Sequence, residues 1–139
     1  YVARAAQTRV MSIGLMPGSR LPAHCTSRGR VLVAALPEPQ ARVLIEQSNL
    51  APRTPASLTA PDDIMARLSE VRDRGYALID QEVEMGLRSI AVPVLNHKGS
   101  TIAALNIGVA AVQAQAEDLV TDFLPLMLKV QAGLTRVLT

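Results

Sequence analysis

The sequence predicts an α+β domain, in which an antiparallel sheet carries helices on its faces. Apolar residues alternate with polar ones near the start of the chain and again in its second half, which is typical of strands. Between and after these segments the apolar residues recur at helical spacing. The expected order is two strands, three helices, three strands and a final helix, within 139 residues that suffice for one domain.

The first two strands are expected over residues 1–4 and 10–16, as a hairpin. Pro17–Arg20 has the composition of a turn, because proline fixes φ and glycine accepts positive φ. The first helix follows, with Thr26 or Ser27 as its cap. Its expected apolar positions are Val31, Leu32, Ala35 and Leu36.

Two more helices precede the second group of strands. One begins near Pro39, and its expected apolar face consists of Ala41, Leu44 and Ile45. The next begins with a capping box of Thr59 and Asp62 and ends at Gly75. Its expected apolar stripe consists of Ile64, Leu68 and Val71.

The second half of the chain predicts three strands and a long helix. The strands are Tyr76–Asp80, Arg88–Leu95 and Thr101–Val109, and residues 81–86 form an irregular connection. The final helix runs from about residue 117 to about residue 138. Pro125 should kink or break its first turns, because proline donates no backbone hydrogen bond.

The last two strands are expected to have one bulky face and one face of small residues. The small face carries Ser89, Ala91 and Pro93 on one strand and Ala104, Asn106 and Gly108 on the next. A turn centred on His97 and Lys98 pairs Ser89 with Asn106, whereas a centre one residue later pairs it with Gly108. The small face suits a ligand pocket, or alternatively it lies under a closely packed helix.

The stretch His24–Arg30 is rich in polar side chains at the point where a loop becomes a helix. Backbone N–H groups, the Ser27 hydroxyl and Arg28 could hold a carboxylate there. Gly29 would allow a ligand or another backbone segment to approach closely. Alternatively, Thr26 or Ser27 is an ordinary cap and the arginines face water.

Composition excludes several classes of function. The net charge is +2 and aromatic residues make up 2%, which argues against nucleic-acid binding by this segment. A single cysteine fits the reducing cytoplasm, and neither a membrane span nor a leader is evident. We expect no cofactor and no metal, since His24, Cys25, His97 and Asp80 lack ligand spacing. Glu82 and Glu84 are expected in a solvated loop and not as an acid pair.

Three stretches resemble signatures of one family. They are Leu21–Leu36 (LPAHCTSRGRVLVAAL), Arg74–Val94 (RGYALIDQEVEMGLRSIAVPV) and Gly99–Val109, which contains AALNIG. Together they resemble the C-terminal effector-binding domain of IclR-type transcription regulators, over nearly the whole chain. The resemblance implies a curved antiparallel sheet flanked by helices, similar to GAF or profilin domains. It also implies a homodimer or homotetramer, and a winged helix-turn-helix domain absent from this chain as the part that binds operator DNA.

The resemblance also implies where an effector would bind. The positions that match the family's pocket are Ser27, Arg28, Gly29, Ile79, Asp80, Ser89, Asn106 and Gly108. Glyoxylate-responsive members have serines where Asn106 and Gly108 stand, a cysteine at Ser89 and a small residue at Arg28, which speaks against glyoxylate. The stretches Arg9–Leu15 and His24–Ser27 are closer to regulators of protocatechuate, 4-hydroxybenzoate and β-ketoadipate catabolism.

Our prediction is a cytoplasmic sensor domain, not an enzyme, that binds a small carboxylated metabolite, either an aromatic acid or a ring-cleavage product. The first alternative is an oligomerisation domain without a physiological ligand, which the aliphatic composition and the long final helix permit. The second is a hydrolase with Cys25 as nucleophile, which would require a base within hydrogen-bonding reach of the thiol.

Overall fold

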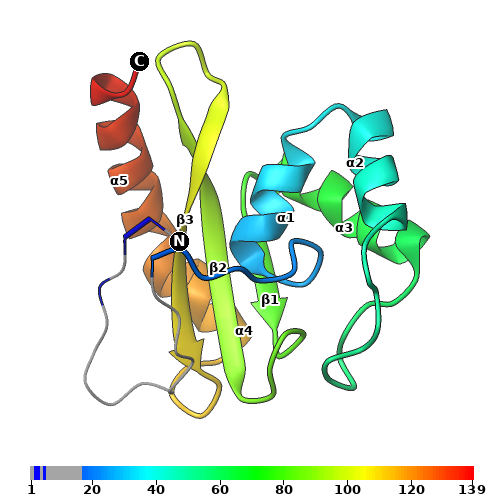
Figure 1. Ribbon diagram of the computed structural model, residues 1–139. Coiled ribbons are helices and arrows are strands. Elements are labelled where there is room, and N and C mark those ends of the chain that lie inside the picture. Colours follow the sequence, from blue (N-terminus) through cyan, green and yellow to red (C-terminus); the bar gives the residue numbers. More distant parts are fainter. Residues whose placement is uncertain (1, 4, 6–16) are drawn as a thin grey trace.

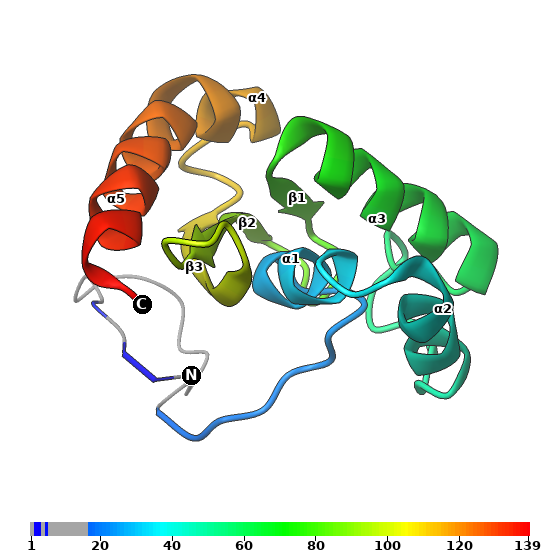
Figure 2. The ribbon, with the colours of Figure 1, turned by 90° about the horizontal axis from the view of Figure 1, so that it is seen from above.

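The computed structural model describes residues 2, 3, 5 and 17–139, and their architecture is α+β as predicted (Figure 1). An antiparallel sheet has the order β1-β2-β3, with β1 at Ala77–Asp80, β2 at Leu87–Leu95 and β3 at Thr101–Ala110. The helices lie on both sides of this sheet (Figure 2). The expected hairpin of residues 1–16 lies outside the described residues, apart from three isolated positions.

Three helices pack together on one face of the sheet: α1 at Ser27–Ala34, α2 at Glu38–Glu46 and α3 at Pro61–Arg74. Their core contains Val31, Ala41, Ile45, Ile64, Leu68 and Val71, together with Ala77 and Ala91 of the sheet. The small side chains Ala77 and Ala91 let α1 and α3 approach the strands closely. The predicted stripe of the third helix is confirmed, since all three of its residues are buried.

The opposite face of the sheet packs against the C-terminal helices. Ile90 and Val92 form a second core with Leu119 and Met127. The bulky side chains of β3 pack against it: Leu105, Ile107 and Val109. The predicted division into a bulky face and a small face is therefore confirmed.

The register of β2 and β3 matches the second of the two predicted alternatives, because Ser89 pairs with Gly108. The connection is longer than a two-residue turn, however. Asn96 Oδ1 accepts the backbone N–H groups of Lys98 at 3.0 Å and Ser100 at 2.9 Å. Leu95 then pairs with Thr101 and Val94 with Ala103, so a bulge at Ile102 shifts the register by one residue.

Helix boundaries show which local signals were decisive. Gly75 ends α3 in the left-handed conformation, with φ +82°, as predicted. The expected capping box is absent, because α3 begins at Pro61 with Ala60 as N-cap and no side chain caps it. Pro61 supplies the helical φ at that position, and Asp62 lies in the first turn, where it complements the helix dipole.

The C-terminal helical segment accommodates Pro125 without a break. It comprises α4 at Ala116–Asp118, a π-helical stretch at Leu119–Phe123 and α5 at Leu124–Val137. Pro125 occupies the first turn of α5, where its missing N–H is tolerated. Among the described residues, no helix has the length and apolar character that a membrane crossing requires.

Two expected helix faces are partly wrong. Leu32 in α1 and Leu44 in α2 are exposed, and α1 ends at Ala34, so that Ala35 is its C-cap. Val31 is buried as predicted, and Ser27, Arg30 and Ala34 are buried beside it. The buried face of α1 differs from the predicted one because one of its buried positions holds Arg30, which a pattern of apolar residues does not detect.

Candidate functional site

Three of the predicted site residues form one row across the sheet. Ile79 in β1 pairs with Ser89 in β2, and Ser89 pairs with Gly108 in β3. Because residues paired across strands share a face, all three lie on the face that α1 covers. Ile79 and Ser89 are buried, whereas Gly108 is exposed. The row therefore runs from the buried core at Ile79 to the exposed surface at Gly108.

Arg28 connects the first turn of α1 to this face of the sheet. Its Nη1 atom donates a hydrogen bond to Asn106 Oδ1 at 3.3 Å. Asn106 is half-buried and lies two residues before Gly108, so it shares the same face. Arg28, Asn106, Ser89 and Gly108, which are distant in sequence, are thus brought to one side of the sheet.

The start of α1 has an uncommon arrangement of its cap. Thr26 is the N-cap, but its hydroxyl donates to the carbonyl of Pro22 at 2.8 Å and caps no N–H group. The first turn of α1 contains no acidic residue, and the side chain of Ser27, its first residue, is buried. The positive end of the helix dipole is therefore neutralised by neither a capping hydroxyl nor a carboxylate of the helix.

Gly29 allows the backbone of α1 to lie close to the backbone of Ala23. A Cβ at this position would lie 2.5 Å from both Ala23 Cα and Thr26 Oγ1. The sequence allows either a ligand or a chain segment beside this glycine. The structure shows that the segment 23–26 occupies the space beside it.

The small-residue face divides into a closed and an open part. Ala91 is buried and Ala104 packs against the same core under α1, so a helix covers this part. Near Gly108 the described residues leave more space, since among them a Cβ on Gly108 would come close only to Leu87 Cδ1, at 3.6 Å. The alternative of a closely packed helix is thus confirmed at Ala91 and Ala104, whereas a ligand pocket near Gly108 stays a prediction.

Asp80 does not join the other predicted residues. It pairs with Arg88, one position beyond the row of Ile79 and Ser89, and its side chain therefore belongs to the opposite face. Asp80 Oδ1 accepts a hydrogen bond from Arg88 Nε at 2.8 Å. Arg88 Nη1 also donates to the carbonyls of Ala111 and Ala114, both at 2.8 Å, which fixes the segment before α4.

Arg30 and Glu82 form a buried ion pair that the sequence analysis missed. The guanidinium of Arg30 donates to both carboxylate oxygens of Glu82, and its Nε donates to the carbonyl of His24 at 2.8 Å. The expectation that the arginines face water is wrong for Arg30, and the expectation of a solvated loop is wrong for Glu82 but correct for Glu84. Arg30 lies three residues after the buried Ser27, and this helical spacing could have revealed it.

His24 and Cys25 are buried, and their environment opposes nucleophilic chemistry. Burial raises the pKa of the Cys25 thiol, and the nearby charges of Arg53 and Arg30 oppose that rise only in part. Burial, followed by the charges of Arg30 and Arg53, lowers the pKa of His24. In the described part of the chain, no three His, Cys, Asp or Glu side chains gather closely enough to hold a metal ion.

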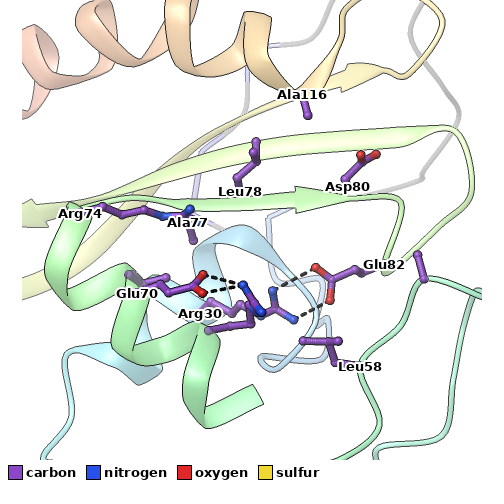
Figure 3. Close-up of a pocket in the computed structure, with 12 residues that line it drawn as sticks. Arg30, Leu58, Glu70, Arg74, Ala77, Leu78, Asp80, Glu82 and Ala116 are labelled. Carbon is purple, nitrogen blue, oxygen red and sulfur yellow. Dashed lines mark hydrogen bonds and ion pairs between the residues drawn. The ribbon is translucent and has the colours of Figure 1, made fainter. Parts of the chain in front are cut away.

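A cavity of about 400 Å³ lies elsewhere, along the outer edge of β1 (Figure 3). Residues of α3 and β1 and the residues Leu58, Glu82 and Ala116 line it. Asp80 is the one member of the predicted site among the residues that line this cavity. The cavity is therefore distinct from the small-residue face beside Arg28.

Comparison with known proteins identifies the family. Residues 1–132 match the family described as bacterial transcriptional regulator IclR, C-terminal. The chain is 40% identical over 129 residues to the Pca regulon regulatory protein of Pseudomonas putida, covering 92% of this chain and 44% of the relative. It is 39% identical over 127 residues to the p-hydroxybenzoate hydroxylase transcriptional activator of Acinetobacter baylyi, covering 91% of this chain and 47% of the relative.

Solved structures agree with these relatives. A transcriptional regulator from Rhodococcus sp. RHA1 superposes with a TM-score of 0.92 at 38% identity, covering 98% of this chain and 54% of that chain. The inducer-binding domain of PobR from Acinetobacter, a double mutant in complex with 3-hydroxybenzoic acid, superposes with a TM-score of 0.86 at 38% identity. The match covers 93% of this chain and 74% of that chain.

The chain spans about half the length of the curated relatives that it matches. These relatives are transcriptional regulators, which confirms the prediction that the chain is not an enzyme and overturns the hydrolase alternative. The matches to regulators of aromatic catabolism confirm the predicted subgroup. The chain belongs to the IclR family of bacterial transcriptional regulators, as a C-terminal effector-binding domain.

Proposed function

We propose that this domain senses a small aromatic carboxylic acid, which binds between the first turn of α1 and the open part of the small-residue face. The single observation that supports this proposal most directly is the hydrogen bond between Arg28 Nη1 and Asn106 Oδ1. It places a cation from α1 over the strand that carries Gly108, where side chains leave space.

The chemistry of these groups favours an anion. Arginine only donates hydrogen bonds, so Asn106 must direct its oxygen to Arg28, and its NH₂ group is left to donate elsewhere. Ser27 and Ser89 add hydroxyl groups, and the uncapped start of α1 adds the positive end of a helix dipole. None of these residues is acidic. A carboxylate can accept from several such donors at once.

Two relatives support an aromatic acid as the ligand class. One is named for activating p-hydroxybenzoate hydroxylase, and the PobR inducer-binding domain was crystallised with 3-hydroxybenzoic acid. We propose that the carboxylate contacts Arg28 and the start of α1, while Ser89 and Asn106 bond the polar groups at the far end. Gly29 and Ile79 would shape the site from behind without contacting the ligand, and Asp80 would lie outside it.

A thermal-shift screen would test this function. The panel comprises 4-hydroxybenzoate, 3-hydroxybenzoate, protocatechuate, β-ketoadipate, pyruvate and glyoxylate. A ligand at about 100 times its dissociation constant should stabilise the fold by roughly 2.7 kcal/mol. The substitution Ser89→Leu, which places a larger side chain beside Gly108, should abolish the shift. Stabilisation by a hydroxybenzoate that survives Ser89→Leu would contradict the assigned site.

Regulation would follow from a change in the arrangement of subunits. We propose that the full protein carries a winged helix-turn-helix domain outside this chain, as well as a fold related to GAF domains within it. Ligand binding would shift operator affinity only if the two states of the protein bind the ligand with different affinity. Gel-shift titrations of the full-length protein with and without hydroxybenzoate would measure that coupling.

The alternative of an oligomerisation domain has one structural observation in its favour. The side chains of Leu126, Val130 and Val137 on α5 are exposed. Exposed aliphatic residues on one helix are common in subunit interfaces. Sedimentation of this chain would show a concentration-dependent dimer or tetramer, and a monomer across the accessible range would contradict this function.

A further inference from the structure

The strand β1 presents a free backbone edge, because it pairs with β2 on one side only in the described part of the chain. The N–H of Gln81 bonds the carbonyl of Leu87 at 2.9 Å. Since backbone groups alternate in direction along an antiparallel ladder, Ile79 and Ala77 also face β2. Leu78 and Asp80 therefore direct their N–H and C=O groups away from the sheet.

A second hydrogen bond confirms this alternation. The Nε atom of Arg74 donates to the carbonyl of Tyr76 at 3.1 Å. Tyr76 lies two residues before Leu78, so its carbonyl points to the same outer edge. The edge thus begins beside a guanidinium group and continues past two residues whose backbone groups the ladder leaves unpaired.

The cavity of about 400 Å³ lies along this edge, and Figure 3 shows it between α3 and Ala116. Its volume is within the range of roughly 300–1,000 Å³ that is usual for small-ligand sites. Val71, Ala77, Leu78 and Leu58 give it an apolar lining. An edge strand enclosed in this way cannot pair with a broad sheet, but it leaves space for a single extended chain.

Most charged groups around the cavity are paired: Arg67 with Glu70, Arg30 with Glu82 and Asp80 with Arg88, whereas Arg74 has no ion pair among the described residues. Arg74 lies at the start of β1, with its guanidinium 4.4 Å from the centre of the Tyr76 ring. Within the described residues, only its Nε is hydrogen-bonded to a protein atom, so both terminal nitrogens can bind a carboxylate. Asp80 lies at the other end, beside the ion pair of Arg30 and Glu82 (Figure 3). Asp80 uses Oδ1 toward Arg88 and Gln81, and Oδ2 accepts no bond from a described residue.

We propose that this cavity binds a short peptide of about three residues in extended conformation, antiparallel to β1. The first and third residues would pair with the outward backbone groups of Asp80 and Leu78, which are two positions apart as an antiparallel ladder requires. The terminal ammonium would then lie near Asp80 and the terminal carboxylate near Arg74. This site lies at the edge of the sheet and does not depend on the aromatic-acid site under α1.

Titration of the ¹⁵N-labelled chain with trialanine tests the site, with amide chemical shifts as the readout. We expect shifts at Leu78 and Asp80 and none at Asn106 or Gly108. Arg74→Gln should weaken trialanine binding about tenfold, the usual size of a lost charge-assisted hydrogen bond. Arg74 is exposed, so its removal should not unfold the chain, and Arg136→Gln on α5 is the matched control that should leave affinity unchanged.

Blocking the two ends of the peptide tests the charge assignment. N-acetylated trialanine should bind more weakly than trialanine to the parent chain, and Asp80→Asn should remove most of that difference. The proposal would be overturned by an absence of shifts in β1 at millimolar trialanine. It would also be overturned if acetylation or Arg74→Gln left the affinity unchanged.

Discussion

The carboxylate of Glu82, in the loop after β1, accepts hydrogen bonds from both terminal guanidinium nitrogens of Arg30 in α1. The distances are 3.0 Å for Nη1–Oε2 and 2.5 Å for Nη2–Oε1. The side chain of Arg30 is only 3% exposed and that of Glu82 only 11%. The carbonyl of Glu82 also accepts the Ser57 hydroxyl at 2.6 Å. One buried pair thus joins α1, the β1–β2 loop and the loop before α3.

Removing one partner of this pair should destabilise the fold strongly. Glu82→Ala leaves the Arg30 charge buried and unpaired, which typically costs about 3–5 kcal/mol. The double variant Arg30→Met with Glu82→Leu removes both charges and should recover much of that loss. Urea unfolding of the three proteins would measure the difference. A loss below about 1 kcal/mol for Glu82→Ala would mean that the pair is solvated, as surface pairs are.

Two helical glycines should respond in opposite directions to alanine. Gly29→Ala should destabilise α1 by about 1–3 kcal/mol, because the new methyl group would overlap the backbone of Ala23. Gly133→Ala in α5 meets none of the described residues within 4 Å and should stabilise the fold by about 0.5–1 kcal/mol through helix propensity. Thermal unfolding would measure both variants. Stabilisation by Gly29→Ala would show that the segment 23–26 is not held against α1.

Predictions from the sequence are confirmed where one strong local signal decides the structure. Alternating residues predicted the two faces of β2 and β3, and Gly75 predicted the end of α3, because only a residue without Cβ enters the left-handed region readily. The register was left open between two values, since the bulge at Ile102 depends on a loop held by Asn96. Turn composition does not encode that loop.

The sequence predicted which segments gather at the candidate site, but not which contacts their side chains make. The small face and the start of α1 were found from spacing and from the family signatures. The approach of Arg28 to Asn106 depends on how α1 crosses the sheet, which is a tertiary property. The inward position of Arg30 and the side of Asp80 were missed because charged residues were assumed to face water. The likeness to GAF and profilin domains stays a prediction.

Stability should fall in mild acid because of His24. Burial, with the charges of Arg30 and Arg53, lowers the pKa of His24 from its ordinary value of 6.5. In the unfolded chain the imidazole keeps its ordinary pKa and binds a proton first as the pH falls. His24 therefore has no effect on stability well above about pH 6.5 and reduces it progressively below that pH.

Urea unfolding between about pH 8 and about pH 5 would measure this dependence. The variant His24→Gln should flatten the slope in the acid range. His97→Gln, in the exposed connection between β2 and β3, is the matched control for loss of an imidazole. An unchanged slope in His24→Gln would contradict a buried neutral imidazole in the folded state.

The thiol of Cys25 should react slowly in the folded protein. Burial raises its pKa and also blocks access to the sulfur, and the thiolate is the reactive form. Reaction with Ellman's reagent should be slow in buffer and fast in denaturant. Rapid reaction of the native chain would indicate an exposed thiolate and would contradict the buried position.

Isothermal titration of 4-hydroxybenzoate into the parent chain, Arg28→Gln and Arg136→Gln tests whether the effector binds at Arg28. If the carboxylate binds at the first turn of α1, Arg28→Gln should weaken binding by about tenfold to a hundredfold, as loss of a charge-assisted hydrogen bond does. Arg136→Gln, on the exposed surface of α5, should bind as the parent does. Equal affinity for all three proteins would contradict the assigned effector site.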